Sequence, residues 1–120
     1  MSIIKEFNIG VATNKSRIAL NNGLKKHNLN EVFDITLTME EAKPKPDPDM
    51  AIQAMSKFNI EKKSTVIVGD TINDIGLGVN AGINSIGVAW GYNSIEMLRN
   101  EGADFIIKDS KELFDTINNL

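Results

Sequence analysis

The chain contains no cysteine, a single histidine, only three prolines and no long hydrophobic run. The absence of cysteine excludes disulfides, thiolate zinc sites and a cysteine nucleophile, and it fits a reducing cytoplasm. The longest apolar stretches, such as 65–68 and 83–90, have the length of strands and are too short to cross a membrane. Because no charged start is followed by an apolar stretch and a cleavage site, we expect a cytoplasmic protein.

The charge of the chain gives no sign of a polyanionic partner. Among 120 residues, 13 are Lys or Arg and 16 are Asp or Glu, for a formal net charge of -3. This balance disfavours binding to nucleic acid or to an anionic membrane surface. The hydrophobic content of 42% is sufficient for one core, so we expect residues 1–120 to form a single domain.

Short apolar runs alternate with helical patterns along the chain. The pattern predicts strands at 9–13, 34–38, 65–69, 85–89 and 105–107, and helices at 15–27, 73–81, 94–101 and 110–118, with one more helix beginning near residue 48. Strands that alternate with helices are typical of a parallel sheet covered on both faces. The sequence therefore predicts an α/β fold with a three-layer, Rossmann-like parallel sheet.

The segment 39–48 contains all three prolines. Each proline lacks an N–H donor and restricts the residue before it, so this segment is predicted to be a stiff loop. We expect Asp47 to cap the helix that follows, with Pro48 at its first position. Apolar residues at helical spacing then predict a buried helix face, to which Met50, Met55 and Phe58 belong.

Polar side chains follow the predicted strands at the points where these end. Thr13 and Asn14 follow the first strand, Lys43 lies in the proline loop, and Asp70 and Asp74 follow the strand 65–69. Ligands of such sheets bind beyond the carboxyl ends of the strands. A hydroxyl, an ammonium and two carboxylates at one rim would suit Mg²⁺ and a phosphoryl group.

Three stretches in this order resemble the motifs of a phosphatase family. ATNKS (12–16), KPKP (43–46) and GDTIND (69–74) are similar to the second, third and fourth motifs of the haloacid-dehalogenase-like phosphatases, especially the phosphoglycolate-phosphatase-like branch. The segments 87–94 and 101–107 also resemble that branch. The resemblance implies a Mg²⁺-dependent phosphomonoester hydrolase that acts on a small phosphorylated metabolite through an aspartyl-phosphate. Phosphoglycolate is the default substrate of the resemblance, and nucleotide and sugar phosphates stay open as comparable alternatives.

The resemblance also implies a role for each matched residue. Thr13 would bind the transferring phosphoryl group, and Asn14 would support that loop. Lys43 would bridge the nucleophile and the phosphoryl oxygens. Asp70 would contact Mg²⁺ directly, and Asp74 would hold the metal or its waters.

One motif of the family is not found in this sequence. Members begin with a strand ending in DxDGT, which supplies the nucleophile and an acid and base, followed by a cap that selects substrate. In residues 1–8 the only carboxylate is Glu6, and the spacing Asp47-Pro48-Asp49 follows prolines instead of an apolar strand. The resemblance implies that the first motif and the cap lie upstream of residue 1. We therefore expect an inactive isolated chain that binds Mg²⁺ only at millimolar concentration.

In that family the missing strand lies in the middle of the sheet, between the strands represented here by 9–13 and 65–69. Unpaired backbone groups in a protein interior are costly. We therefore expect an isolated chain either to pair these two strands directly or to fill the gap with a strand from another molecule, as a homodimer or by strand exchange.

Two classes of function stay open. The chain is either the C-terminal portion of a phosphatase or a non-catalytic module that binds metal or phosphate, or that oligomerises. A receiver-type phosphoacceptor is disfavoured because its acidic, hydroxyl and lysine positions occur in another order. Among the remaining polar residues, Lys45 is expected to be merely exposed and His27 to end its helix. For Trp90 and Tyr92, contact with a substrate or partner is one alternative, and packing on the sheet edge is the expected one.

Overall fold

The computed structural model describes residues 7–120. In chain order the elements are β1 (Gly10–Ala12), α1 (Arg17–Lys26), β2 (Ile35–Leu37), α2 (Asp49–Phe58), the short 3-10 helix η1 (Lys62–Ser64), β3 (Val66–Gly69), α3 (Ile72–Ala81), β4 (Asn84–Val88), α4 (Ile95–Glu101), β5 (Phe105–Ile107) and α5 (Glu112–Asn118). The predicted alternation of strands and helices is confirmed. None of the helices in this part of the chain is both long enough and apolar enough to span a lipid bilayer.

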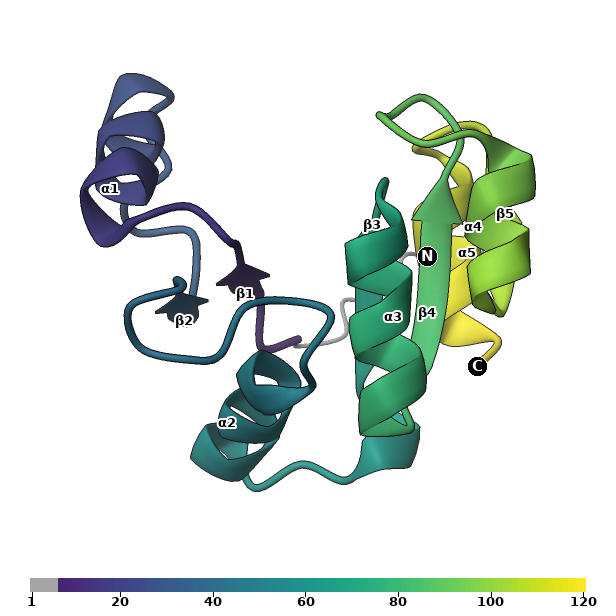
Figure 1. Cartoon of the computed structure of the whole chain (residues 1–120), viewed down its shortest axis with the longest axis horizontal. Helices are drawn as coiled ribbons and strands as arrows, with labels where there is room; N and C mark the ends of the chain where they lie inside the picture. The colour runs from purple at the N-terminus through teal and green to yellow at the C-terminus, as the bar shows by residue number, and fades with distance from the viewer. Residues whose placement is uncertain (1–6) are drawn as a thin grey trace, which may run out of the picture.

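All pairs of neighbouring strands are parallel, but the strands form two separate sheets (Figure 1). In the first sheet β1 pairs with β2, with Gly10 opposite Ile35. In the second sheet the order is β3-β4-β5, with Val66 opposite Asn84. Within residues 7–120, β1 and β3 do not pair with each other. Of the two expected alternatives, direct pairing of these strands is therefore wrong for this structure, and a strand supplied by another molecule stays a prediction.

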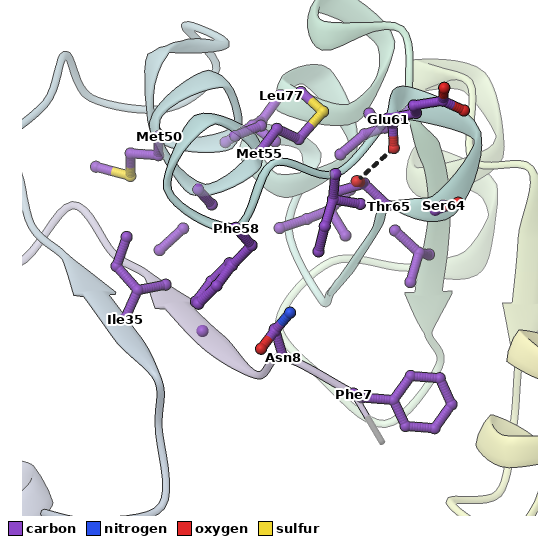
Figure 2. A pocket seen from close by; sticks show the side chains of 18 of the residues that line it. Phe7, Asn8, Ile35, Met50, Met55, Phe58, Glu61, Ser64, Thr65 and Leu77 are labelled. Atoms are coloured by element: carbon purple, nitrogen blue, oxygen red, sulfur yellow. Dashed lines mark hydrogen bonds between the residues drawn. The ribbon is translucent and has the colours of Figure 1, made fainter. Parts of the chain in front are cut away.

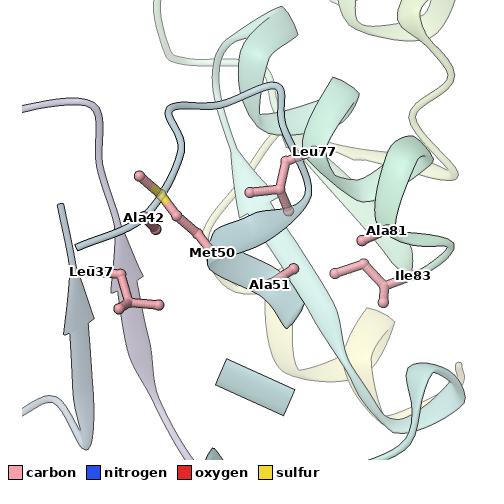
Figure 3. Close-up of a cluster of buried hydrophobic side chains, with 7 residues drawn as sticks. All are labelled: Leu37, Ala42, Met50, Ala51, Leu77, Ala81 and Ile83. Atoms are coloured by element: carbon pink, nitrogen blue, oxygen red, sulfur yellow. The ribbon is translucent and has the colours of Figure 1, made fainter. Parts of the chain in front are cut away.

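Helix α2 explains how the sheets stay together without that pairing, because it packs on β1 and on α3. Seven buried apolar residues form the cluster at this junction: Leu37, Ala42, Met50, Ala51, Leu77, Ala81 and Ile83. Figure 3 shows the cluster running from Leu37 in β2 through Met50 in α2 to Leu77 in α3. Burial of a leucine, isoleucine or methionine side chain contributes about 1.5–3 kcal/mol to stability, so side-chain packing stabilises the junction. The prediction that Met50 is a core residue is confirmed, and Met55 packs against the cluster.

Helices cover both faces of the sheet formed by β3, β4 and β5, as predicted. Helices α3 and α4 pack on one face. On the other face, Ile86, Val88 and Ile107 are buried beneath Leu113 and Ile117 of α5. Successive residues of a strand point to opposite faces, and Val66 and Ile67 of β3 accordingly contribute to the two different clusters.

The proline segment is irregular, as predicted, but α2 begins differently from the prediction. Pro48 is the N-cap residue and makes no side-chain cap bond, and the first helical residue is Asp49. The Asp47 carboxylate accepts a hydrogen bond from the Asp49 backbone N–H at 2.9 Å. Asp47 therefore does satisfy a first-turn amide, but from one position farther outside the helix than predicted, because Pro48 occupies the cap.

Arg17 ties α1 to the segment around β2. Its guanidinium forms an ion pair with Glu41 and donates to the hydroxyl and the carbonyl of Thr36, at 2.8 and 2.9 Å. The Glu41 carboxylate also accepts from the Thr38 backbone N–H at 2.9 Å. Both hydrogen bonds hold the pKa of Glu41 below its usual value of 4.5. The bond from Arg17 has the largest effect, and the bond from the Thr38 amide has the next largest.

Glu41 should titrate below 4.5 in the unmodified chain, and Arg17→Met should raise its pKa toward that value. Because the folded-state pKa is the lower one, these contacts stabilise the fold above the unfolded-state pKa, and their contribution is lost as pH falls through the folded-state pKa. NMR titration of the side-chain carboxyl carbon measures the shift. Lys26→Met, at the far end of α1, should leave this pKa unchanged, and an unshifted Glu41 would contradict the assignment.

Candidate functional site

Lys45 lies at the edge where β1 and β3 end. Its Nζ donates to Asp74 Oδ1 at 2.5 Å, and the two side chains are only 12% and 10% exposed. The side-chain amide of Asn14 binds the backbone of Lys45 twice: its Oδ1 accepts from Lys45 N at 2.8 Å, and its Nδ2 donates to Lys45 O at 3.1 Å. Lys45 therefore connects the residues that follow β1 with the first turn of α3. The carboxyl ends of β1 and β3 consequently lie at the same edge of the molecule.

The structure brings Lys45, rather than the predicted Lys43, against the acidic residues. Lys43 is exposed, and its contact is a backbone one, from its N–H to Asp49 Oδ2 at 3.0 Å. The expectation that Lys45 is merely exposed is wrong, because its ammonium is paired with Asp74. The loop holds two overlapping Lys-Pro-x-Pro stretches, 43–46 and 45–48, and the sequence prediction used the first. The second lies closer to α2 and would have identified Lys45.

Asp74 is already bound by several donors. Its Oδ2 accepts from the backbone N–H groups of Asp70 and Thr71, both at 3.2 Å, and from the Thr71 hydroxyl at 2.9 Å. Thr71 and Asp74 form the capping box at the start of α3. Gly69 makes this approach possible, because a Cβ there would lie 2.2 Å from Asp74 Oδ2. Asp74 therefore both caps α3 and holds Lys45.

Asp70 is held by the loop that follows β4. Its Oδ2 accepts from the Tyr92 backbone N–H at 2.8 Å, and its backbone carbonyl accepts from Asn93 N at 2.9 Å. A Cβ at Gly91 would lie 2.0 Å from the Cβ of Asp70, so only glycine permits this contact. Sequence reasoning missed this support, because backbone groups provide it. The prediction that Trp90 and Tyr92 pack on the sheet edge is wrong, since their side chains are 56% and 85% exposed.

Thr13 and Asn14 lie at the same edge because they directly follow β1. The Thr13 N–H donates to Leu37 O at 3.0 Å, and its hydroxyl oxygen accepts from Lys15 N at 3.1 Å. The hydroxyl proton of Thr13 thus stays able to donate to a ligand. Asn14 holds the proline loop through Lys45, which is a different support from the one predicted for it.

The donor set at this edge suits a loosely held Mg²⁺. Residues 7–120 contain no group of three or more His, Asp or Glu side chains placed to hold a metal. Asp70 keeps one carboxylate oxygen without a hydrogen-bond partner among these residues, whereas both oxygens of Asp74 are engaged. Mg²⁺ commonly takes one or two carboxylates together with waters and substrate phosphate oxygens. Asp70 fits the role of such a carboxylate ligand of Mg²⁺, whereas Asp74 fits better as the ion-pair partner of Lys45.

Comparison with known proteins gives one family. The family model described as haloacid dehalogenase-like hydrolase matches residues 4–88. Among curated proteins, the pyrophosphatase PpaX of Bacillus velezensis is 32% identical over 108 residues, which are 89% of this chain and 50% of that protein. The pyrophosphatase PpaX of Bacillus pumilus is 33% identical, again over 89% of this chain and 50% of the relative. The chain therefore spans about half the length of the curated relatives it matches.

Solved structures of similar proteins have the same fold. A protein described as a predicted phosphatase from Clostridium acetobutylicum superposes with a TM-score of 0.82 at 30% identity, over 95% of this chain and 53% of that chain. A haloacid dehalogenase-like protein of unknown function from Agrobacterium tumefaciens gives a TM-score of 0.82 at 22% identity, over 91% of this chain and 53% of its own. At that identity the second likeness shows the fold alone.

Lys45→Met should lower the free energy of unfolding by about 2 kcal/mol, because the poorly exposed Asp74 carboxylate loses its cationic partner. Lys43→Met, the same change two positions earlier, should alter that free energy by less than about 0.5 kcal/mol. Urea denaturation measures both. Adding Asp74→Asn to Lys45→Met should recover part of the loss, because no charge is then left unpaired. Equal losses in the two single variants would contradict the assignment of Lys45.

Proposed function

Because this chain belongs to the haloacid dehalogenase-like hydrolase family, we propose that it supplies the metal- and phosphoryl-binding portion of a Mg²⁺-dependent phosphatase. One observation carries the proposal: Lys45 links Asn14, after β1, with Asp74, after β3, at the edge where Asp70 also lies. Parallel α/β sheets bind their ligands at this edge. The site therefore combines a cation, a carboxylate with a free oxygen and a hydroxyl donor.

Each residue has a proposed task in binding a phosphoryl group. The Lys45 ammonium would stabilise the negative charge that develops on the phosphoryl group. The Thr13 hydroxyl donates to a phosphoryl oxygen, and Asn14 positions Lys45 through its two backbone hydrogen bonds. Asp70 would hold Mg²⁺, which neutralises charge on the phosphoryl oxygens when bound. Lys45 thus takes the task that the sequence resemblance assigned to Lys43.

The nucleophile is proposed to come from outside residues 1–120. Of the carboxylates at this edge, Asp74 is held by Lys45 and three further donors, and Asp70 is held by Tyr92. We assign the attack to an aspartate on a neighbouring segment, as in the DxDGT motif. Its carboxylate oxygen would bond to phosphorus while the bond to the leaving oxygen breaks, and water would then release phosphate from the aspartyl-phosphate.

The proposed substrate is a small phosphorylated metabolite or pyrophosphate. The relative from Bacillus velezensis is named a pyrophosphatase, and the structural neighbour from Clostridium acetobutylicum is described as a predicted phosphatase. The chemistry common to both names is transfer of a phosphoryl group to water. Thr13, Lys45 and Asp70 are all proposed to bind the phosphoryl group and not the remainder of the substrate. They therefore support the reaction class and do not identify the leaving group.

A non-catalytic module that binds metal or phosphate is the second candidate. One observation favours it: the charge of Lys45 is already matched by Asp74. A phosphoryl ligand would have to compete with that carboxylate for the ammonium. The two candidates differ in turnover, because the module would bind the same ligands without hydrolysing them.

The purified chain should hydrolyse p-nitrophenyl phosphate with Mg²⁺ at no more than the background rate. Co-expression with a segment that contains an apolar strand ending in DxDGT should produce turnover, and Asp70→Asn should abolish that turnover. Release of p-nitrophenol measures both. Activity of the chain alone that is lost in Asp70→Asn would show that a group within residues 1–120 makes the attack. Absence of turnover in a stable co-expressed complex would favour the non-catalytic module.

Mg²⁺ should bind the isolated chain with a dissociation constant of about 1 mM, because one available carboxylate is a weak ligand set. Asp70→Asn should remove this binding, whereas Glu31→Gln, an equal loss of charge at an exposed position, should leave it unchanged. Isothermal titration calorimetry measures the affinity. Micromolar binding, or binding that survives Asp70→Asn, would contradict the proposed metal ligand.

A further inference from the structure

The proline loop lies against α3 at more points than the ion pair of Lys45. The side chain of Asn80, in the last turn of α3, donates through Nδ2 to the Pro46 carbonyl at 2.9 Å. Gly76 lets Pro46 come this close, because a Cβ at that position would lie 2.8 Å from the Pro46 Cβ. Residues four apart share one face of a helix. Gly76 and Asn80 therefore form one surface of α3 that receives Pro46.

The contacts with α3 lie on both sides of Lys45 in the loop. Asp74 binds the Lys45 ammonium in the first turn of the helix, and Asn80, six residues farther along, binds the carbonyl of Pro46. Six residues of helix span about 9 Å. Figure 1 shows the segment between β2 and α2 reaching across to α3. The loop is thus laid along the helix and does not touch it at one point only.

Consecutive backbone groups of the loop are bound by two asparagine side chains. Asn14, which follows β1, binds the N–H and the carbonyl of Lys45. Asn80 binds the next carbonyl, that of Pro46. A shift of the loop away from α3 would break the bond from Asn80, and a shift away from β1 would break the bonds from Asn14. The two side chains together fix the place from which the Lys45 side chain starts.

Sheet hydrogen bonds do not fix that place, because β1 and β3 do not pair within residues 7–120. A cleft of about 800 Å³ is lined by β1, by the start of β3 and by side chains of α2 such as Met55 and Phe58 (Figure 2). The two sheets are therefore joined near the rim by side-chain contacts of the proline loop. Each of these contacts matters more for Lys45 than it would beside a continuous sheet.

We propose that Asn80 is a positioning residue for the phosphoryl site, acting through Pro46 on Lys45. Its amide holds the loop against α3, so that the Lys45 ammonium stays beside Asp74 at the rim. Asn80 lies at the other end of α3 from Asp70, so it does not itself contact a ligand at the rim. Small displacements of a charged group reduce its effect on a reacting centre. The inference rests on the proposed function, which gives Lys45 the task of stabilising phosphoryl charge.

A role of Asn80 in ending its own helix accounts less well for these contacts. The C-cap of α3 is Gly82, whose backbone N–H binds the carbonyls of Gly78 and Val79. The Asn80 amide takes no part in that cap and binds a carbonyl 34 positions earlier in the chain. Its bond therefore serves the proline loop.

Exchange of the Lys45 ammonium protons with water tests the proposal without Mg²⁺ or phosphate. The Lys45 side chain is only 12% exposed and is ion-paired, so its ammonium protons should exchange slowly in the unmodified chain. Asn80→Asp keeps the shape of the side chain but removes its donor, and it should make this exchange about fivefold or more faster. Heteronuclear NMR of the Nζ group measures the rate. A loss of stability alone would lower the urea midpoint and leave this native-state rate unchanged.

A matched variant and a second substitution make the result decisive. Asn22→Asp makes the same change at an exposed position of α1 and should leave the Lys45 exchange rate unchanged. Circular dichroism checks that the variants fold. If Asn80→Asp does not fold, Asn80→Ala replaces it, because alanine has the highest helix propensity and also lacks the donor. Unchanged Lys45 exchange in a folded Asn80 variant would overturn the proposal.

Turnover separates this inference from the proposed function. In a stable complex with the DxDGT segment, Asn80→Ala should lower kcat about fivefold or more and change KM little, because it acts through the residue that stabilises developing charge. Faster Lys45 exchange in the variant, with no turnover by the complex of the unmodified chain, supports the positioning role and counts against the proposed function. Turnover with a kcat that Asn80→Ala does not change would overturn the positioning role and leave the proposed function in place.

Discussion

The ion pair between Lys45 and Asp74 is the constraint on which the arrangement of the site depends. It joins the loop that follows β2 in the first sheet to the helix that follows β3 in the second, and Asn14 fixes the loop from the β1 side. Because both side chains are nearly buried, the pair is screened little by solvent and loses much if one partner is removed. The other oxygen of the Asp74 carboxylate caps the start of α3 and accepts from the Asp70 backbone N–H, so one carboxylate positions both Lys45 and Asp70.

The second constraint is the interruption of the sheet. Side-chain packing between α2 and α3, rather than a ladder of hydrogen bonds, spans the space between β1 and β3. This leaves two parallel edges of equal direction open, with the polar residues at their carboxyl ends. The polar residues of the candidate site therefore lie at the carboxyl ends of two strands that do not pair with each other within residues 7–120.

Sequence reasoning predicted the elements well because their signals are local. Apolar runs such as 65–69 mark strands, and apolar residues at helical spacing mark helices, without tertiary information. The site was harder to predict. Lys43 and Lys45 each begin a Lys-Pro-x-Pro stretch, the prediction assigned the role to Lys43, and the fold brings Lys45 to Asp74. The support of Asp70 by the Tyr92 amide leaves no side-chain pattern, and its sequence signal is Gly91 in the loop that follows β4.

Amide hydrogen exchange in the free chain reports which β1 amides are hydrogen-bonded. The Thr13 N–H, which is bonded to Leu37, should exchange slowly, whereas the Ala12 N–H, which is directed away from β2, should exchange much faster. Because both amides lie in the same short segment, the difference between their exchange rates does not depend on the overall stability of the fold. Equal protection of Ala12 and Thr13 in a monomer would show that β1 already has a second partner, and it would contradict the open edge.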